Sequence, residues 1–232
     1  MELEKAVAGL YRAFADVPRP RQVTGCTHCC ISEEELARLV SVPREALTAD
    51  ELETYSSNLL TTVGSEADFR YFLPRILELV AHGELQRMGV GWELQSLRSL
   101  PWTTWPGEQV DAVQAYLLAW WRQALSEGKG DDGHLAILSE IGPAGEFQRS
   151  LDAWLTLNRL AIIHLAEFIH EHITRLALGK AWNEIATRET ARCLYGWLRS
   201  GPPAHALEQA HDADPSAPDA LLLLEAAALV TP

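Results

Sequence analysis

The chain has 232 residues, of which 47 % are hydrophobic, and its 19 basic and 32 acidic residues give a net charge of −13. This length and composition are typical of a folded chain with its own core, and they exclude a mostly disordered, collagen-like or disulfide-stapled protein. Both halves are acidic, and the clustered Lys and Arg of a sequence-independent nucleic-acid binder are missing, so we expect no nucleic-acid partner.

The N-terminal segment does not resemble a signal peptide, because it carries Glu2 and Glu4 and lacks a continuous apolar stretch. No run in the sequence approaches the roughly 18 apolar residues of a membrane-spanning helix. The four cysteines are too few for a disulfide scaffold. We therefore expect a cytoplasmic protein with reduced thiols and no membrane partner.

Three capping boxes predict helix starts in the first third of the chain. They are Ser32 to Glu35, Thr48 to Glu51, and the weaker Ser65 to Asp68. In each, the hydroxyl can accept the backbone N–H three residues on, and the carboxylate can reach back to the first backbone N–H. Pro74 follows within an apolar stretch, where it either kinks one helix or opens a new one.

Later helices follow from apolar periodicity and from the residues that end helices. We expect helices at 110–125, 151–178, 182–200 and 218–230, ended in the first three cases by Gly128, Gly179 and Gly201-Pro202-Pro203. Strand and hairpin signals are poor. The predicted fold is an all-α, irregular bundle or array of about 8–10 helices in one domain, 1–232, with a loose division near residue 104.

A cysteine-rich turn carries the strongest chemical signal. Cys26 and Cys29 have the spacing of a zinc knuckle, and His28 and Cys30 add candidate ligands. A structural zinc site needs four ligands and no second Cys-x-x-Cys exists, so His205 and His211 are distant candidates for its completion. A redox function is also open, because thiols just before a helix have lowered pKa values. Free thiols in a packed turn are the plainest interpretation.

The histidines give weaker signals. Glu167-x-x-His170 and Glu208-x-x-His211 have the spacing found in helical di-iron proteins. On a helical wheel, however, His170 falls on the water side, whereas iron ligands project inwards. His164 falls at the edge of the apolar face, which favours a hydrogen-bonded core histidine over a catalytic base.

Two further groups are candidate interaction residues. Trp102 and Trp105 lie in a turn and either supply core or form an exposed binding patch. Arg70 and Arg75 either pair with acidic neighbours or hold a ligand carboxylate.

One segment resembles a known group of proteins. The turn Gly25-Cys26-Thr27-His28-Cys29-Cys30 is followed by Thr61-Thr62-Val63-Gly64 and by Asp68 to Glu78, which reads DFRYFLPRILE. It resembles uncharacterised bacterial proteins that share this FLPRILE-like segment behind a Cys-rich turn. The resemblance covers about a third of the chain. It implies a bacterial, soluble, mainly helical protein and brings no activity.

The leading functional hypothesis is a protein-interaction module, either an acidic inhibitor or immunity-type protein or a homo-oligomer, because no phosphate loop, dinucleotide fingerprint or hydrolase motif occurs. The alternative is a zinc-binding protein or metal-dependent enzyme that uses the Cys26–Cys30 turn. A third hypothesis is a small-molecule pocket around Arg70 and Arg75.

Overall fold

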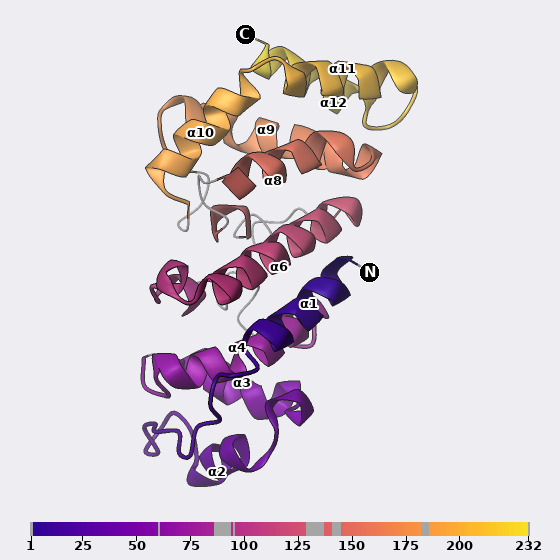
Figure 1. Ribbon diagram of the computed structural model, residues 1–232. Helices are drawn as coiled ribbons and strands as arrows, with labels where there is room; N and C mark the ends of the chain where they lie inside the picture. Colours follow the sequence, from indigo (N-terminus) through magenta and orange to yellow (C-terminus); the bar gives the residue numbers. More distant parts are fainter. Residues whose placement is uncertain are drawn as a thin grey trace. The chain divides into compact units, whose positions relative to one another are not determined.

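The computed structural model describes residues 2–59, 61–85, 94, 96–128, 137–140, 145–181 and 186–231. The fold is 71 % helical, and ten α-helices and two short 3-10 helices follow one another in the described residues (Figure 1). This confirms the predicted all-α class. The chain forms two compact units, Met1–Tyr116 and Leu117–Pro232, and the division falls inside α6 (Gly107–Ser126). The single domain divided near residue 104 stays a prediction.

The first unit is organised around helix α4. Its elements are α1 (Glu2–Ala13), α2 (Glu33–Ser41), η1 (Arg44–Ala46), α3 (Ala49–Asn58), α4 (Glu66–Ala81), η2 (Trp102–Thr104) and the first half of α6. α1, η1 and α3 all pack against α4, which is buried on most of its surface. α4 runs through Pro74 as one helix, so the proline does not open a new one.

All three predicted capping boxes are confirmed, at the starts of α2, α3 and α4. The Ser32 hydroxyl accepts the Glu35 N–H at 3.1 Å, and the Glu35 carboxylate accepts the Ser32 N–H at 2.8 Å. The boxes at Thr48 and Ser65 repeat this exchange. These reciprocal bonds satisfy backbone donors that a helix start otherwise leaves unpaired, which is why short polar motifs located the helices so well.

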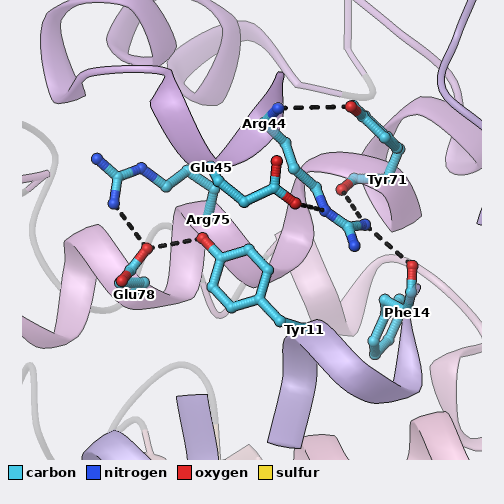
Figure 2. Close-up of polar contacts among 7 residues, drawn as sticks. All are labelled: Tyr11, Phe14, Arg44, Glu45, Tyr71, Arg75 and Glu78. Atoms are coloured by element: carbon cyan, nitrogen blue, oxygen red, sulfur yellow. Dashed lines mark hydrogen bonds and ion pairs between the residues drawn. The ribbon is translucent and has the colours of Figure 1, made fainter. Parts of the chain in front are cut away.

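A polar network fastens α1 to α4 (Figure 2). The Tyr11 hydroxyl donates to the Glu78 carboxylate at 2.7 Å, and Arg75 donates to the same oxygen at 2.6 Å. Arg75 also donates to the backbone carbonyl of Leu47 at 2.8 Å, just before α3 begins. One arginine therefore joins the central helix to the start of α3.

A buried arginine holds a second junction of the first unit (Figure 2). Arg44 of η1 donates through Nη1 to the carbonyls of Phe14 at 3.0 Å and Tyr71 at 3.1 Å. Its guanidinium lies 5.1 Å from the centre of the Tyr71 ring, and its Nε pairs with Glu45 at 3.0 Å. The arginine is tolerated in the core because its charge is paired and two backbone acceptors use its donors.

The second unit is built around α9. Its elements are the second half of α6, then α8 (Gly145–Thr156), α9 (Arg159–Ala177), α10 (Arg188–Leu198), α11 (Pro202–Ala213) and α12 (Ala220–Val230). α8, α10, α11 and α12 all contact α9, and α11 and α12 form a close pair (Figure 1). Trp121 and Trp154 meet edge to face in this core, with ring centres 5.1 Å apart.

The single helix predicted for 151–178 is wrong, because the chain breaks between α8 and α9. Asn158 interrupts it: its side chain accepts the N–H of Ala161 at 3.0 Å and donates to the carbonyl of Ser126 at 3.1 Å. A short amide side chain that caps a helix competes with a continuous backbone ladder. Asn158 therefore starts a new helix, α9, at a point where the apolar periodicity predicted that one helix would continue.

The other boundaries shift by a few residues. α10 begins at Arg188 with Thr187 as its cap, and positions 182–185 of the expected helix lie outside the described residues. Pro202, expected as part of a helix stop, is also the first residue of α11, where a missing N–H costs nothing. Across the described residues, no helix has the length and apolar character needed to cross a membrane.

Candidate metal centre

Three thiols, those of Cys26, Cys29 and Cys30, lie together in the turn that comes just before α2. The Sγ atoms of Cys26 and Cys29 are 3.8 Å apart, and those of Cys29 and Cys30 are 3.5 Å apart. All three Sγ atoms lie within 4.8 Å of one another, and this group could hold a metal ion. Cys29 is exposed and the other two are half-buried, so an ion has access to the cluster.

The turn is held in place from the N-terminal side by a short antiparallel contact. Gly25 pairs with Val63, the Cys26 N–H donates to Thr62 O at 3.0 Å, and the Gly64 N–H donates to Thr24 O at 2.8 Å. Gly25 is needed at this contact, because a Cβ there would lie 2.9 Å from Ile31 and 3.1 Å from Val63.

Bonds within the turn and one from the end of α3 hold it on the C-terminal side. The Cys26 carbonyl accepts the N–H groups of Cys30 at 3.1 Å and Ile31 at 3.3 Å, which closes the turn directly before the α2 cap. The Asn58 side chain, at the end of α3, donates to the Cys30 carbonyl at 3.3 Å. The thiols are therefore displayed by backbone that is tied at both ends.

The electrostatics differ between the thiols. The backbone N–H groups of His28 and Cys29 donate to the Cys26 sulfur and lower the pKa of that thiol. The pKa of Cys29 is raised to about 11, because its thiol hydrogen-bonds to those of Cys30 and Cys26 and negative charge on these neighbours opposes its ionisation. Cys26 therefore ionises more readily than Cys29, and a bound cation would favour the thiolate form of the cluster.

Other residues predicted as ligands are placed differently. His28 is exposed in the same turn, but the group of three consists of the thiols alone. His205, His211 and the exposed Cys193 belong to the second unit. Among the residues that the structure describes, no other set of three His, Cys, Asp or Glu side chains is close enough to share an ion.

The sequence left two alternatives for the tryptophan turn, and the structure supports core packing rather than an exposed patch. Trp102 and Trp105 are only 6 % and 7 % exposed, and Trp105 packs edge to face on Phe14 at 5.9 Å. The Trp105 indole N–H donates to Glu66 at 2.8 Å. Because their large apolar rings gain more from burial than from exposure, both side chains are part of the first unit's core and form no exposed patch.

The two arginines are occupied by contacts within the first unit. Arg75 pairs with Glu78 and Leu47 as described above, which matches the pairing expected with an acidic neighbour. Arg70 donates to the neutral side chain of Gln109 at 2.8 Å, and its guanidinium lies 5.3 Å from the centre of the Trp105 ring. These contacts fasten α4 to α6 and to the segment just before α3, and the buried Nε of Arg70 has no hydrogen-bond partner among the described residues.

The exposure of His164 and His170 in α9 agrees with their positions on the helical wheel. His170 and Glu167 are exposed, which opposes a di-iron site. His164 is buried, and its Nδ1 accepts the indole N–H of Trp154 at 3.0 Å. It is therefore a hydrogen-bonded core histidine.

The comparisons with known proteins leave the chain without an assigned family. No family model matches it, and neither a curated protein nor a solved structure is significantly similar to it. The resemblance to bacterial proteins with an FLPRILE-like segment therefore stays a prediction.

Sequence reasoning located the cysteines but missed the residues that position them. Asn58 holds the turn from 28 positions away, and the backbone of Thr62 and Gly64 holds it from 36 and 40 positions away. The Thr61–Gly64 stretch entered the sequence argument only through the resemblance. Hydrogen bonds to backbone leave no periodic signal in the sequence.

Proposed function

We propose that the protein binds a zinc ion through the thiolates of Cys26, Cys29 and Cys30. The observation that carries this proposal is the separation of the sulfur atoms, 3.8 Å and 3.5 Å. With Zn–S bonds of about 2.3 Å, two sulfurs of a tetrahedral site are about 3.8 Å apart. Two of the three sulfur separations are thus close to an edge of a zinc tetrahedron, and the third lies within 4.8 Å.

The hydrogen bonds around Cys26 support the same proposal. Two backbone N–H groups already point at its sulfur, and such donors stabilise a thiolate in a metal site as they do in the free turn. Thiolate is also the ligand class that zinc prefers over the hard cations Mg²⁺ and Ca²⁺. Neighbouring thiolates repel one another, and a bound zinc ion would offset this repulsion.

The direct test is elemental analysis of protein purified under reducing conditions. We expect about one zinc per chain, and a lower melting temperature after chelation, because an ion that binds only the folded turn stabilises it. Cys26→Ser combined with Cys29→Ser should abolish zinc binding, whereas Cys193→Ser should retain it. Metal-free protein with three freely titrating thiols and an unchanged melting temperature would refute the proposal.

A second candidate function is association with another protein through α12. Leu221 and Leu224 of this helix are 66 % and 47 % exposed, although its opposite face is buried against α9 and α11. We propose a homo-oligomer, because adjacent exposed leucines on one helix favour self-association. Leu221→Glu with Leu224→Glu should shift sedimentation from oligomer to monomer without unfolding the chain. A monomeric wild type would exclude the homo-oligomer, and this result would not bear on the zinc proposal.

A further inference from the structure

The thiols of Cys26, Cys29 and Cys30 are reduced and accessible to small molecules, because Cys29 is exposed and the other two are half-buried. Cysteines that respond to oxidants are accessible and lie beside a second thiol that can complete a disulfide. Sulfur separations of 3.8 Å and 3.5 Å place Cys29 beside two such thiols. The turn therefore has the two features that reversible thiol oxidation requires.

Cys26 and Cys29 are placed for a disulfide without backbone movement. The Cys30 N–H donates to the Cys26 carbonyl at 3.1 Å and closes the turn that contains both residues. Residues three apart in a turn have Cα atoms less than about 7 Å apart, which is also the limit for a pair that a disulfide can bridge. Their sulfurs are 3.8 Å apart. Rotation of the two side chains has to bring the sulfurs only about 1.8 Å closer to reach the length of a disulfide bond.

The sulfurs of Cys29 and Cys30 are closer, at 3.5 Å, but their backbone is unsuitable for a disulfide. The described residues contain no cis peptide bond. Neighbouring Cα atoms across a trans peptide are about 3.8 Å apart, whereas disulfides usually join Cα atoms about 4.4–6.8 Å apart. A bond between adjacent cysteines is therefore strained, and the backbone favours Cys26 with Cys29.

The turn is held by hydrogen bonds that do not involve sulfur. The Cys26 N–H donates to the Thr62 carbonyl at 3.0 Å, and the Asn58 side chain donates to the Cys30 carbonyl at 3.3 Å. Two groups that a fixed backbone holds close together react with each other much faster than with groups on another molecule. Oxidation is therefore expected to join two thiols of one turn rather than two chains.

We propose that Cys26 and Cys29 form a reversible disulfide when a peroxide oxidises the turn, which makes this pair a redox modification site. A consequence for the metal rests on the proposed function. Cysteine binds metals as the thiolate, and a sulfur in a disulfide is no longer one. The bond leaves Cys30 as the remaining thiol of the cluster, so oxidation releases zinc and reduction restores the site.

A peroxide alone balances the reaction. One of the two sulfurs attacks an oxygen of hydrogen peroxide, the O–O bond breaks, and the products are a sulfenic acid and one water. The second sulfur displaces the sulfenic hydroxyl, an S–S bond forms, and a second water leaves. Both S–H protons end in the waters, and the two electrons that the thiols lose reduce the peroxide. An added dithiol reverses the bond by thiol–disulfide exchange.

The test follows the mass and the free thiols of the metal-free full chain after treatment with equimolar hydrogen peroxide. Cys193→Ser is present throughout, so that only the thiols of the turn can react. We expect each chain to lose two hydrogen atoms and two of its three thiols, and to regain them with dithiothreitol. Thiols that stay reduced, disulfide-linked dimers, or sulfinic acid without a disulfide would each overturn the inference.

Serine variants in the same background identify the pair, and they are matched because each exchanges one sulfur for oxygen on the same turn. Cys30→Ser should form the disulfide as fast as its parent, because Cys30 takes no part. Cys26→Ser and Cys29→Ser should form one at least about tenfold more slowly. Fast closure in Cys26→Ser would assign the bond to Cys29 and Cys30, and fast closure in Cys29→Ser would assign it to Cys26 and Cys30. Either result contradicts the proposed pair.

Zinc release separates the inference from the proposed function. With the zinc-loaded chain, a chromogenic chelator should report free zinc at the rate at which the disulfide forms. A chain that forms the disulfide between Cys26 and Cys29 but never binds zinc supports the modification site and refutes the proposed function. A chain that binds zinc but forms no disulfide keeps the proposed function and refutes the inference. Zinc that stays bound after the disulfide has formed refutes the consequence for the metal.

Discussion

The backbone N–H of Gly64 donates to the carbonyl of Thr24 at 2.8 Å, and this bond ties the cysteine turn to the start of α4. Gly64 has a φ of +73°, and a Cβ at this position would lie 2.9 Å from the ring of the buried Tyr55. Glycine is therefore required both by the backbone conformation and by the packed ring. The same residue precedes the Ser65 cap, so it serves the turn and the helix at once.

Gly64→Ala should lower the free energy of unfolding by more than about 1 kcal/mol, because the substitution combines a left-handed backbone with a clash. It should also weaken zinc binding, because Thr24 and Cys26 lose their anchor. Urea denaturation and zinc titration measure the two effects. Gly107→Ala is the control: its Cβ meets nothing within 4 Å at the start of α6, and it should be neutral. Equal effects of the two substitutions would contradict this account.

Arg44→Met should destabilise the protein by about 3 kcal/mol, because it removes the two hydrogen bonds that the buried guanidinium donates to the carbonyls of Phe14 and Tyr71. The matched control is Arg38→Ala, which removes an exposed ion pair with Glu51 and should cost at most about 0.5 kcal/mol. Thermal and urea unfolding distinguish them. A mild effect of Arg44→Met would mean that its hydrogen bonds contribute little beyond the packing of its stem.

Tyr11→Phe should cost about 1 kcal/mol at neutral pH, a value reduced for the partial exposure of Tyr11 and Glu78. Burial raises the pKa of Glu78, but the hydrogen bonds from Tyr11 and Arg75 outweigh it, and the pKa lies below its ordinary value of 4.5. The folded state thus binds the proton less readily than the unfolded state. The stabilisation is complete above pH 4.5 and is lost as the pH falls through the lowered pKa.

The pH dependence supplies the check on this interaction. The difference in unfolding free energy between wild type and Tyr11→Phe should be constant from about pH 6 to 8 and shrink below about pH 4. Denaturant titrations across this range measure it. A difference that grows on acidification would show that the hydroxyl does not stabilise the carboxylate form of Glu78.

Asn158→Ala should lower stability by about 1 kcal/mol, because α9 loses its N-terminal cap and Ser126 loses a donor. Thr156→Ala, two residues earlier, removes an exposed hydroxyl that bonds back to Asp152 and should change stability by less than about 0.5 kcal/mol. Differential scanning calorimetry compares the two. An Asn158→Ala protein as stable as the wild type would mean that the break between α8 and α9 needs no cap.

The sequence alone determined the helical class and the starts of α2, α3 and α4. These features depend on interactions within four residues of one another, such as the exchange between Ser32 and Glu35, and the residue types in that window fix the outcome. The Cys26–Cys30 cluster was visible for the same reason, because its spacing is local. The cap at Asn158 also depends on residues within one helical turn. The apolar periodicity continues on both sides of it, however, and so predicted one continuous helix.

Only the tertiary structure decided how the turn is held and which candidate residues are occupied. Asn58 and Gly64 form hydrogen bonds with residues that lie 28 and 40 positions earlier in the chain. Arg70 and Trp105 are in contact although 35 positions separate them. Such contacts depend on the packing of whole helices, which a reading of neighbouring residues does not contain. Helix packing buries Trp102 and Trp105 in the core. The same packing leaves the three thiols exposed or half-buried, where an ion can reach them.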